Sequence, residues 1–273
     1  MWVWCCPILL VGMCVLIAVA KSYGRRRRSY YAKLAQKRPE LIAGRSPRLQ
    51  VLQPAVALST AFRDTFLLRV GDFLEATSLQ GLREEVLAVS AHKVRSYVPT
   101  HKKGGTVSYE QIHQLCPACL AFYHSEDVRR FVSAVVGEKV GPAGDHDQSA
   151  ESILYYDEAG DHIHWHFDHN FYQGRQFTAL INVVNRSADG RLSASTLVYR
   201  NSQGEDVEVD TAENTFVIFE GSKVLHRATP IQEGDLRIML SMTFNTAPRI
   251  SAIGELQRRI KDTAFFGLRV LWR

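Results

Sequence analysis

The chain has 273 residues, 46% of them hydrophobic and 22% charged, which is enough for one large folded domain with a substantial core. Its formal net charge is +5, but residues 21–48 contain ten Lys or Arg and one acid, Glu40, and so carry +9. Residues 1–20 have no charged side chain, so residues 49–273 carry −4. The basic charge is not spread over a folded face, and we therefore expect no nucleic-acid-binding domain.

The first 20 residues are typical of a membrane anchor. An apolar run extends from Trp2 to Ala20, long enough to cross a bilayer as a helix, and four arginines follow at Arg25–Arg28. Cations after the first span favour a cytosolic position for the following chain. We therefore predict a transmembrane signal-anchor over residues 1–23, a single-pass membrane localisation, and a folded body on the cytosolic side of the endoplasmic reticulum or another endomembrane. The alternative is a signal peptide cleaved after Ala18-Val19-Ala20, with a lumenal or secreted body.

Residues 24–55 are predicted to form a basic linker, because several Pro and Gly residues interrupt any long helical periodicity. A single folded domain is expected over residues 56–248. Its first part contains a short strand at 66–70, an extended segment at 94–99 and a loop at 102–105.

Three helices are predicted in this first part. One follows a Ser78 cap and ends near Lys93, one covers residues 109–123, and one covers 126–136 after a Ser125 cap. Cys116 and Cys119 fall within the second helix. A lone C-x-x-C on a helix favours core packing over zinc binding or redox chemistry.

After Glu151 the sequence pattern changes to short runs of residues that favour β-strands, separated by turns. The predicted strands cover residues 153–156, 162–167, 177–184, 195–200, 206–209, 215–219 and 237–244. About seven short strands at this spacing indicate a sandwich or barrel. The predicted fold class is therefore mainly β with flanking helices (α+β), with a β core over about residues 151–246 and an amphipathic C-terminal helix in 249–273.

Polar side chains recur along the expected strand at 162–167. Alternation would place His162, His164, His166 and Asp168 on one face of the strand and the intervening apolar residues on the other. Three imidazoles and a carboxylate on a buried face are costly unless they bind something. Two His and one carboxylate form the set that holds Fe(II) with coordination positions left open. For His162 and His164 we expect pocket lining, or support of the ligands from behind, in preference to ligation.

Two later residues complete the pattern. His226 follows Asp168 by 58 residues, in a short strand predicted at 224–227, and Arg237 follows His226 by 11 residues. Arg237 begins the apolar run RIMLSMTF, where a guanidinium needs a carboxylate partner. An organic diacid would satisfy it through a bidentate contact.

The segment from Ile153 to Asn245, with LYYDEAGDHIHWHFD, VLHRATPI and GDLRIMLSMTF, resembles the catalytic core of the Fe(II)/2-oxoglutarate-dependent oxygenases, most closely their prolyl 4-hydroxylase-like branch. The resemblance implies a double-stranded β-helix, or jelly roll. It implies Fe(II) ligation by His166, Asp168 and His226. It also implies that Arg237 holds the distal carboxylate of 2-oxoglutarate, with a hydrogen bond from Tyr156 or, alternatively, Tyr155. That branch often has Lys at the anchor position, where this chain has Arg.

The activity that the resemblance implies is a dioxygenase reaction. The cofactors would be Fe(II), 2-oxoglutarate and O₂, with ascorbate in support, and decarboxylation of 2-oxoglutarate would be coupled to hydroxylation of a protein, lipid or small-molecule substrate. Two alternatives stay open. One is a catalytically inactive jelly-roll domain that binds a partner at a membrane. The other is a cupin-type metal-dependent dioxygenase using His164-Trp165-His166, although the Glu and Gly spacing of that class is missing.

Overall fold

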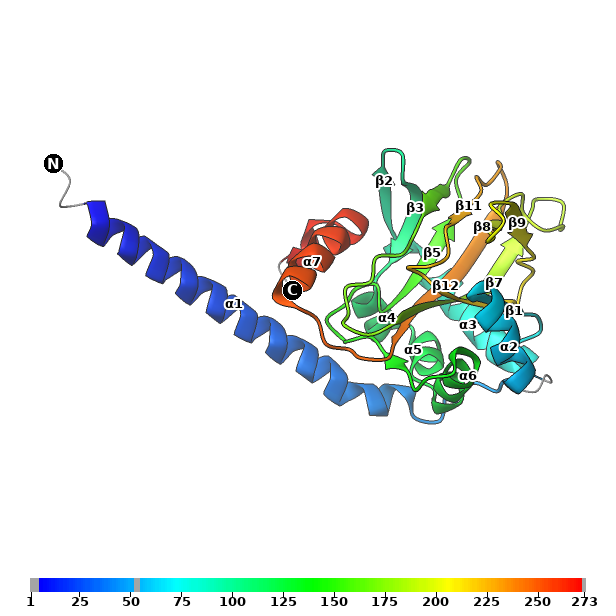
Figure 1. Ribbon diagram of the computed structural model, residues 1–273, viewed down its shortest axis with the longest axis horizontal. Coiled ribbons are helices and arrows are strands. Elements are labelled where there is room, and N and C mark those ends of the chain that lie inside the picture. Colours follow the sequence, from blue (N-terminus) through cyan, green and yellow to red (C-terminus); the bar gives the residue numbers. More distant parts are fainter. Residues whose placement is uncertain (1–4, 52–54, 272–273) are drawn as a thin grey trace.

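The computed structural model describes residues 5–51 and 55–271 and shows a β-rich domain flanked by helices (Figure 1). The described strands are β1 (Leu67–Val70), β2 (Val94–Val98), β3 (Lys102–Val107), β4 (Gly141–Pro142), β5 (Glu151–Tyr156), β6 (His162–His166), β7 (Gln176–Arg186), β8 (Leu197–Arg200), β9 (Asp206–Val209), β10 (Phe216–Glu220), β11 (His226–Ala228) and β12 (Leu236–Asn245). Their order is β1-β10-β7-β12-β5-β3-β6-β11-β8-β9, with β2 beside β3 and β4 beside β12. Every described pair is antiparallel. The sheet bends into a nearly closed, barrel-like jelly roll, which confirms the predicted mainly β fold.

Alternation along the central strands separates two environments. In β12, the side chains of Ile238, Leu240, Met242 and Phe244 belong to the large core against the helices. The intervening Arg237, Met239, Ser241 and Thr243 line a cavity on the opposite face. This period of two residues is the geometry of a pleated strand with both faces covered. It places polar groups in the interior at regular intervals.

Helices cover the outer face of the central strands (Figure 1). They are α2 (Ala55–Thr65), α3 (Ala76–Ala88), α4 (Tyr109–Leu115), α5 (Pro117–Tyr123) and α6 (Glu126–Val136), with a short 3₁₀ turn at Val89–His92. Ser125 caps α6, as predicted, by accepting a hydrogen bond from the Val128 backbone N–H. Cys116 and Cys119 are fully buried, free thiols in this core, in agreement with the prediction.

The N-terminus corrects the membrane prediction. Helix α1 (Cys5–Ile42) is continuous through the four arginines instead of ending at a membrane boundary. Its second half lies against the body, where Tyr31 and Leu34 are buried and Arg38 forms an ion pair with Asp145. Within the described ranges, no helix has the length and apolar character needed to cross a bilayer. This finding contradicts the predicted membrane localisation. The signal-anchor predicted over residues 1–23 includes residues 1–4, which lie outside the described ranges.

The same helix replaces much of the predicted basic linker. Residues 24–42 are helical although Pro39 lies within the segment. The apolar contacts of Tyr31 and Leu34 with the body stabilise the helix, and sequence periodicity gave no sign of them. Packing of this kind contributes more to a helix than intrinsic propensity does.

Three local predictions differ from the structure. The helix expected at 109–123 is interrupted at Cys116, because the residue before Pro117 is disfavoured in helical geometry. Ser78 lies inside α3 instead of capping it, and its hydroxyl accepts a hydrogen bond from the Arg48 N–H at 2.9 Å. The loop expected at 102–105 is strand β3, which pairs with β2, β5 and β6.

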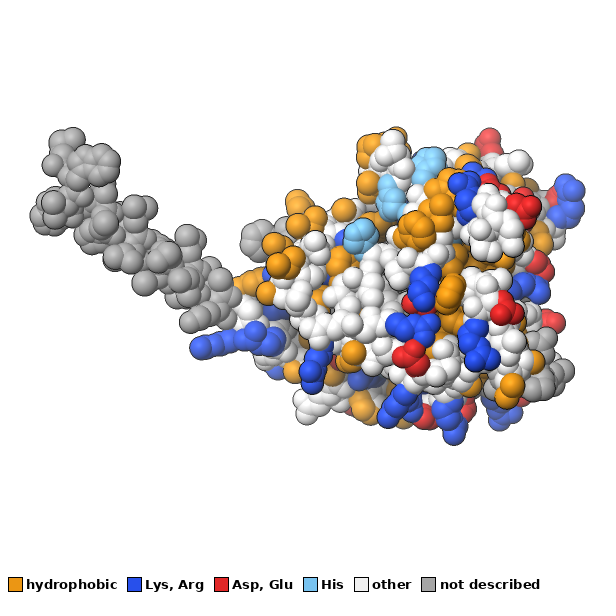
Figure 2. Space-filling view, in the orientation of Figure 1, with side chains coloured by type: hydrophobic (Ala, Val, Ile, Leu, Met, Phe, Trp, Pro, Cys, Tyr) orange, Lys and Arg blue, Asp and Glu red, His pale blue; other side chains and the backbone are white. Residues whose placement is uncertain are grey.

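The C-terminal helix α7 (Ala252–Phe266) lies beside β2 and β3 (Figure 1), and a 3₁₀ turn follows at Leu268–Leu271. It also contacts α1, through an ion pair between Glu255 and Arg27 at 2.7 Å. A buried ionic cluster holds it in place: Arg258 forms ion pairs with Asp262 and Glu255 on the same helix and, at 3.7 Å, with Asp147 on the body. The opposite side of α7 is exposed, with Ile253, Leu256 and Ile260 in contact with solvent. Hydrophobic side chains gather over this helix in Figure 2. Helix α7 thus has a fixed position at the side of the cavity.

Candidate metal centre and its pocket

A cavity of 490 Å³ lies inside the jelly roll. Its walls are the inward faces of β3, β5, β6, β7, β11 and β12, and α7 contributes one side. Apolar atoms provide most of the lining surface, and polar or charged side chains lie among them at many points. Concave apolar pockets with a few convergent polar groups are the usual sites of small-molecule binding.

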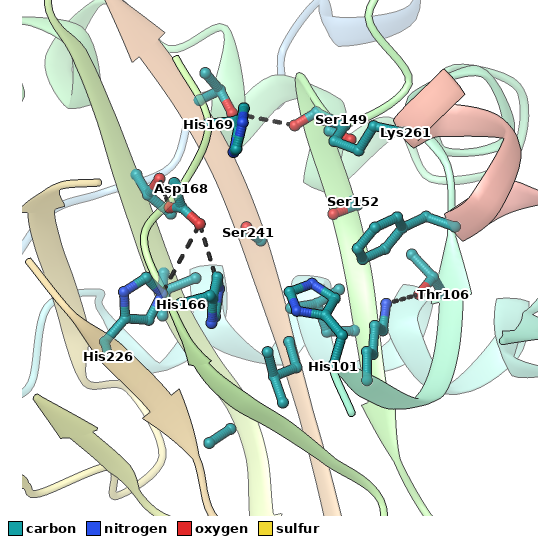
Figure 3. Close-up of a pocket in the computed structure, with 18 of the residues that line it drawn as sticks. His101, Thr106, Ser149, Ser152, His166, Asp168, His169, His226, Ser241 and Lys261 are labelled. Carbon is teal, nitrogen blue, oxygen red and sulfur yellow. Dashed lines mark hydrogen bonds and ion pairs between the residues drawn. The ribbon is translucent and has the colours of Figure 1, made fainter. Parts of the chain in front are cut away.

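His166, Asp168 and His226 come together in this cavity, and Figure 3 shows Asp168 facing both histidines. The Asp168 Oδ1 atom is 3.4 Å from His166 Nε2 and 3.9 Å from His226 Nε2. One ligand atom from each residue lies within 4.8 Å of the others. His166 and His226 are directly paired across β6 and β11, so the sheet register itself brings the two imidazoles together. The three residues that the sequence singled out are thus adjacent.

Hydrogen bonds orient all three side chains. His166 Nδ1 is 2.7 Å from the His164 carbonyl oxygen, and His226 Nδ1 is 3.0 Å from the Val224 carbonyl oxygen. A carbonyl oxygen can only accept, so each Nδ1 carries a proton and each Nε2 is the ring atom directed at Asp168, where a metal ion could bind once that nitrogen is deprotonated. The Thr178 hydroxyl donates to Asp168 Oδ2, which leaves Oδ1 facing the histidines. Such supporting contacts are typical of metal ligands.

Electrostatics favour the ionised carboxylate in this cluster. Burial opposes ionisation of Asp168, but the hydrogen bond to His166 and the charge of His226 outweigh it and lower the pKa of Asp168. For His166, burial opposes protonation, but the neighbouring carboxylate outweighs it and raises the pKa. Burial lowers the pKa of His226. The Asp168 carboxylate stabilises a proton on His166, and a divalent cation bound between these residues would replace that proton.

A bulge in β6 alters the face on which the histidines lie. His226 pairs with His166, but Ala228 pairs with Ile163, so three steps on β6 match two on β11. A bulge of this kind reverses the side-chain alternation. Ile163 and His166 therefore both line the cavity, whereas the rings of His162 and His164 pack edge-to-face outside it with centroids 4.4 Å apart. Pocket lining, the first of the two roles predicted for them, is therefore wrong, whereas His164 supports a ligand through its carbonyl oxygen, which accepts from His166 Nδ1.

Arg237 is the buried cation of the pocket. Its side chain is 1% exposed, and its guanidinium donates to Asn182 Oδ1 at 3.3 Å and Ser195 Oγ at 3.1 Å. Across the described chain, no carboxylate forms an ion pair with it. Burial lowers the pKa of Arg237 to about 10, so the group stays charged at neutral pH. A buried guanidinium held only by neutral groups is suited to an anionic ligand.

Tyr156 accompanies Arg237, and Tyr155 does not. Tyr156 is paired with Arg237 across β5 and β12, lines the cavity, and has its ring centroid 5.9 Å from the guanidinium carbon. The Tyr155 hydroxyl donates instead to the Val86 carbonyl oxygen at 2.7 Å in the core against the helices. Between these two candidates from the sequence, the structure brings Tyr156 to the pocket.

Several pocket residues were not found from the sequence. Thr178 lies at an inward position of β7, and its strand alternation was the only available signal. Gly221 approaches Asp168 so closely that a Cβ there would lie 2.5 Å from the Asp168 Cβ. His101, Lys102 and the α7 residues Lys261 and Phe265 also line the cavity. They come from β3, the turn before it and α7, which the sequence did not connect with the site.

Comparisons with known proteins agree with this geometry. The sequence matches the halogenase D family over residues 53–254. A search of curated protein sequences found no significant match.

Solved structures share the fold at low sequence identity. The epimerase SnoN, in complex with Fe³⁺, alpha ketoglutarate and nogalamycin RO, has 12% identity over 70% of this chain and 83% of its own, with a TM-score of 0.59. A Pseudomonas putida prolyl-4-hydroxylase has 15% identity over 72% of this chain and 100% of its own, with a TM-score of 0.53. EvdO2 from Micromonospora carbonacea var. aurantiaca, complexed with 2-oxoglutarate, has 13% identity over 76% and 96%, with a TM-score of 0.54.

Proposed function

The chain belongs to the halogenase D family, within a fold shared with the Fe(II)/2-oxoglutarate oxygenases, and we propose that it is a non-haem iron oxygenase that hydroxylates an organic substrate at the expense of 2-oxoglutarate. One observation carries the proposal. His166, Asp168 and His226 face the same cavity as the buried Arg237, which has no ion-pair partner among the described carboxylates.

The residues present fit both cofactors. Two neutral imidazole nitrogens and one carboxylate oxygen form a set of ligands with one negative charge. Such a set holds Fe(II) and leaves coordination positions open. Arg237 presents a guanidinium that can receive a carboxylate bidentately, while Asn182 and Ser195 hold it in position. When bound, Fe(II) would allow O₂ to act as the oxidant, one oxygen atom entering the C–H bond of the substrate and the other entering succinate as 2-oxoglutarate loses CO₂.

The side chains perform binding, orientation and exclusion of water. Thr178 and the two backbone carbonyls keep the three ligand atoms directed at one point. Leu180, Phe219 and Met239 line the cavity with apolar surface around that point. Such a lining excludes water and limits side reactions of the oxidant.

Asp168 favours hydroxylation over the halogenation named in the family's description. A six-coordinate ion with three protein ligands and a bidentate 2-oxo acid keeps one open position. Halogen transfer would need two, one for the oxidant and one for the halide. In this chain Asp168 adds a carboxylate to the two imidazoles, and as a ligand it would take one of the two positions that halogen transfer needs.

The experiment is a cofactor assay on the full chain. Anaerobic titration with Fe(II), followed by 2-oxoglutarate and O₂ with ascorbate, should yield succinate from 2-oxoglutarate. His226→Ala should abolish the yield, because one of three ligands is lost. Arg237→Met should abolish the preference of the wild type for 2-oxoglutarate over 2-oxopentanoate, which has no distal carboxylate. Hydrogen bonds to charged groups contribute about 1.5–3 kcal/mol, so that preference should be at least about tenfold.

The outcomes are distinct. Absence of Fe(II) binding and of succinate in the wild type would contradict the oxygenase proposal. Succinate formation with an unchanged preference in Arg237→Met would contradict only the assignment of the anchor. Arg237→Lys, which keeps the charge but not the planar fork, should recover part of the preference.

A further inference from the structure

A second cationic position lies in the cavity, away from Arg237. Lys102 on β3 is 2% exposed and lines the cavity. Its ammonium donates to Thr106 Oγ1 at 2.7 Å and lies 4.7 Å from the centroid of the Phe265 ring. Through the ranges that the structure describes, no carboxylate lies within ion-pair distance of it. An ammonium has three donors, and one goes to Thr106, so two remain for a ligand.

The charges around the cavity favour an anion beyond 2-oxoglutarate. Its lining contains three cationic side chains, Lys102, Arg237 and Lys261, and a single carboxylate, Asp168. Fe(II) and the 2-oxoglutarate dianion cancel each other, so binding both leaves the excess of positive charge unchanged. The sole carboxylate of the lining is directed at the histidines and is not available to an ammonium group. The lining therefore provides partners for an acid and none for an amine.

The position of Lys102 connects it with both α7 and the metal centre. His101 packs edge-on against the His166 ring, with centroids 5.3 Å apart, and against the Phe265 ring at 5.9 Å. In Figure 3, His101 and Thr106 lie across the cavity from His226. From α7, Ile260, Phe265 and Phe266 add apolar surface to the same side of the cavity. A ligand with an anionic end at Lys102 would thus have its apolar body between α7 and the metal centre.

Resting on the proposed function, we propose that Lys102, with Lys261 on the α7 side of the same cavity, binds the anionic headgroup of the substrate, so that the substrate is an organic carboxylate or phosphate with an apolar body. The metal and Arg237 account for the two ends of 2-oxoglutarate, which leaves Lys102 to the substrate. Lys261 has fewer ionic contacts than Arg258, which pairs with three carboxylates. Its ammonium lies 3.7 Å from one carboxylate oxygen of Asp262 and 5.2 Å from the Phe171 ring centroid.

The test compares four octyl probes on the full chain. The protein is loaded anaerobically with Fe(II) and 2-oxoglutarate, and octanoate, octyl phosphate, octylamine and octanol are titrated calorimetrically. At least one of the two anions should bind about tenfold or more tightly than octanol, as expected for a charge-assisted contact, and octylamine should bind more weakly than octanol. The relative affinities of octanoate and octyl phosphate identify the kind of headgroup.

Variants locate the contact. Lys102→Met keeps the length of the side chain and removes the charge, and it should lower the affinity for the preferred anion about tenfold while the affinity for octanol is retained. Lys261→Met should cause a smaller loss of the same kind. Lys139→Met, at an exposed lysine outside the cavity, is the control and should leave all four affinities as in the wild type. Thermal unfolding checks that each variant is folded.

The outcomes separate the two proposals. Failure of the wild type to bind Fe(II) and 2-oxoglutarate would refute the oxygenase assignment. Binding of both cofactors, with the anions binding no more tightly than octanol or not at all, would overturn the anion site alone. Full anion affinity in Lys102→Met would overturn the role of that residue.

Discussion

Thr178 holds the oxygen of Asp168 that does not face the histidines. Its hydroxyl donates to Oδ2, whereas Oδ1 lies toward the Nε2 atoms of His166 and His226. The carboxylate is thereby held with one oxygen available to a metal ion, by a residue of β7, a different strand from those that provide the histidines.

Thr178→Val should weaken metal binding without removing a ligand. Loss of an outer-shell hydrogen bond typically lowers metal affinity or activity about 10–100-fold. Fe(II) affinity, or Co(II) affinity in air, measured by competition with a chelator is expected to fall within that range. Thr178→Ser keeps the hydroxyl and should restore most of the affinity. Equal affinities for the valine variant and the wild type would show that Asp168 does not depend on Thr178.

Gly221→Ala should damage the metal centre through geometry alone. A Cβ at this position would lie 2.5 Å from the Asp168 Cβ and 2.8 Å from its Oδ2. The Asp168 N–H also donates to the Gly221 carbonyl oxygen at 2.9 Å, so the two backbones cannot separate without loss of that bond. We expect metal affinity to fall further than in Thr178→Val, because the whole carboxylate is displaced.

The control for that substitution is Gly141→Ala, where a Cβ would have no heavy atom within 4 Å and the variant should bind metal as the wild type does. Chelator competition and thermal unfolding on both variants provide the comparison. Wild-type metal affinity in folded Gly221→Ala would mean that the loop moves freely and that the close contact has no function.

Much of this centre could be predicted because its ligands are encoded by spacing. His166 and Asp168 are two residues apart at the end of a strand, and the later His226 and Arg237 lie on strands of their own. These residues meet only because strands far apart in the sequence pair with one another. The resemblance to a known family predicted that they would meet, whereas strand alternation alone did not. The bulge in β6 shows the limit of alternation: one extra residue moved His164 out of the cavity and Ile163 into it.

Residues from β3 and α7 were beyond prediction for a different reason. The sequence Lys102-Lys103-Gly104-Gly105 has the composition of a loop, yet pairing on both sides makes it a strand. Its two glycines match close neighbours: a Cβ at Gly105 would lie 3.2 Å from the Tyr155 Cβ, and one at Gly104 would lie 3.1 Å from the Tyr155 carbonyl oxygen. In helix α1 the error was of another kind. The apolar residues at its start indicated a separate membrane anchor, whereas the helix continues to Ile42 and packs against the body.

The pH dependence of anion binding should follow Lys102. Burial lowers the pKa of Lys102 to about 7, with Asp161 favouring and Lys261 opposing the charge, and His101 is the adjacent titratable group on the cavity wall. The protonated form binds an anion, so octanoate affinity should be steady below pH 7 and fall as the pH rises above it. Octanoate itself remains ionised across this range, since carboxyl groups titrate at about pH 4. Calorimetry from pH 6 to 9 provides the measurement.

The pH dependence of the free energy of unfolding provides an independent test of the lowered pKa of Lys102. The folded pKa of Lys102 is depressed, so between pH 7 and the ordinary lysine value of about 10.4 the unfolded chain binds the additional proton and stability rises with pH. Lys102→Met lacks this titration. Its stability advantage over the wild type should therefore be greatest near pH 7 and below, and should shrink toward pH 10. A pH-independent difference, or flat octanoate binding in the wild type, would show that Lys102 does not titrate in this window.

Asp168→Gly should open the metal to halide. Removal of the carboxylate deletes one ligand and one negative charge, and it frees the Thr178 hydroxyl as a donor at the vacated position. A chloride ion there would restore both the charge and the coordination number. Chloride should therefore raise the Co(II) affinity of the variant, by at least about tenfold between chloride-free and chloride-saturated buffer if one ligand is regained, and change the visible absorption of the bound ion. In the wild type, chloride should change neither the Co(II) affinity nor the absorption, because Asp168 already fills the position.

Asp168→Asn, which keeps the side-chain volume, is the matched control and should show a weaker response than Asp168→Gly. Chloride effects of equal size in the wild type and in Asp168→Gly would contradict the assignment of Asp168 as a metal ligand and remove the coordination argument for hydroxylation over halogenation.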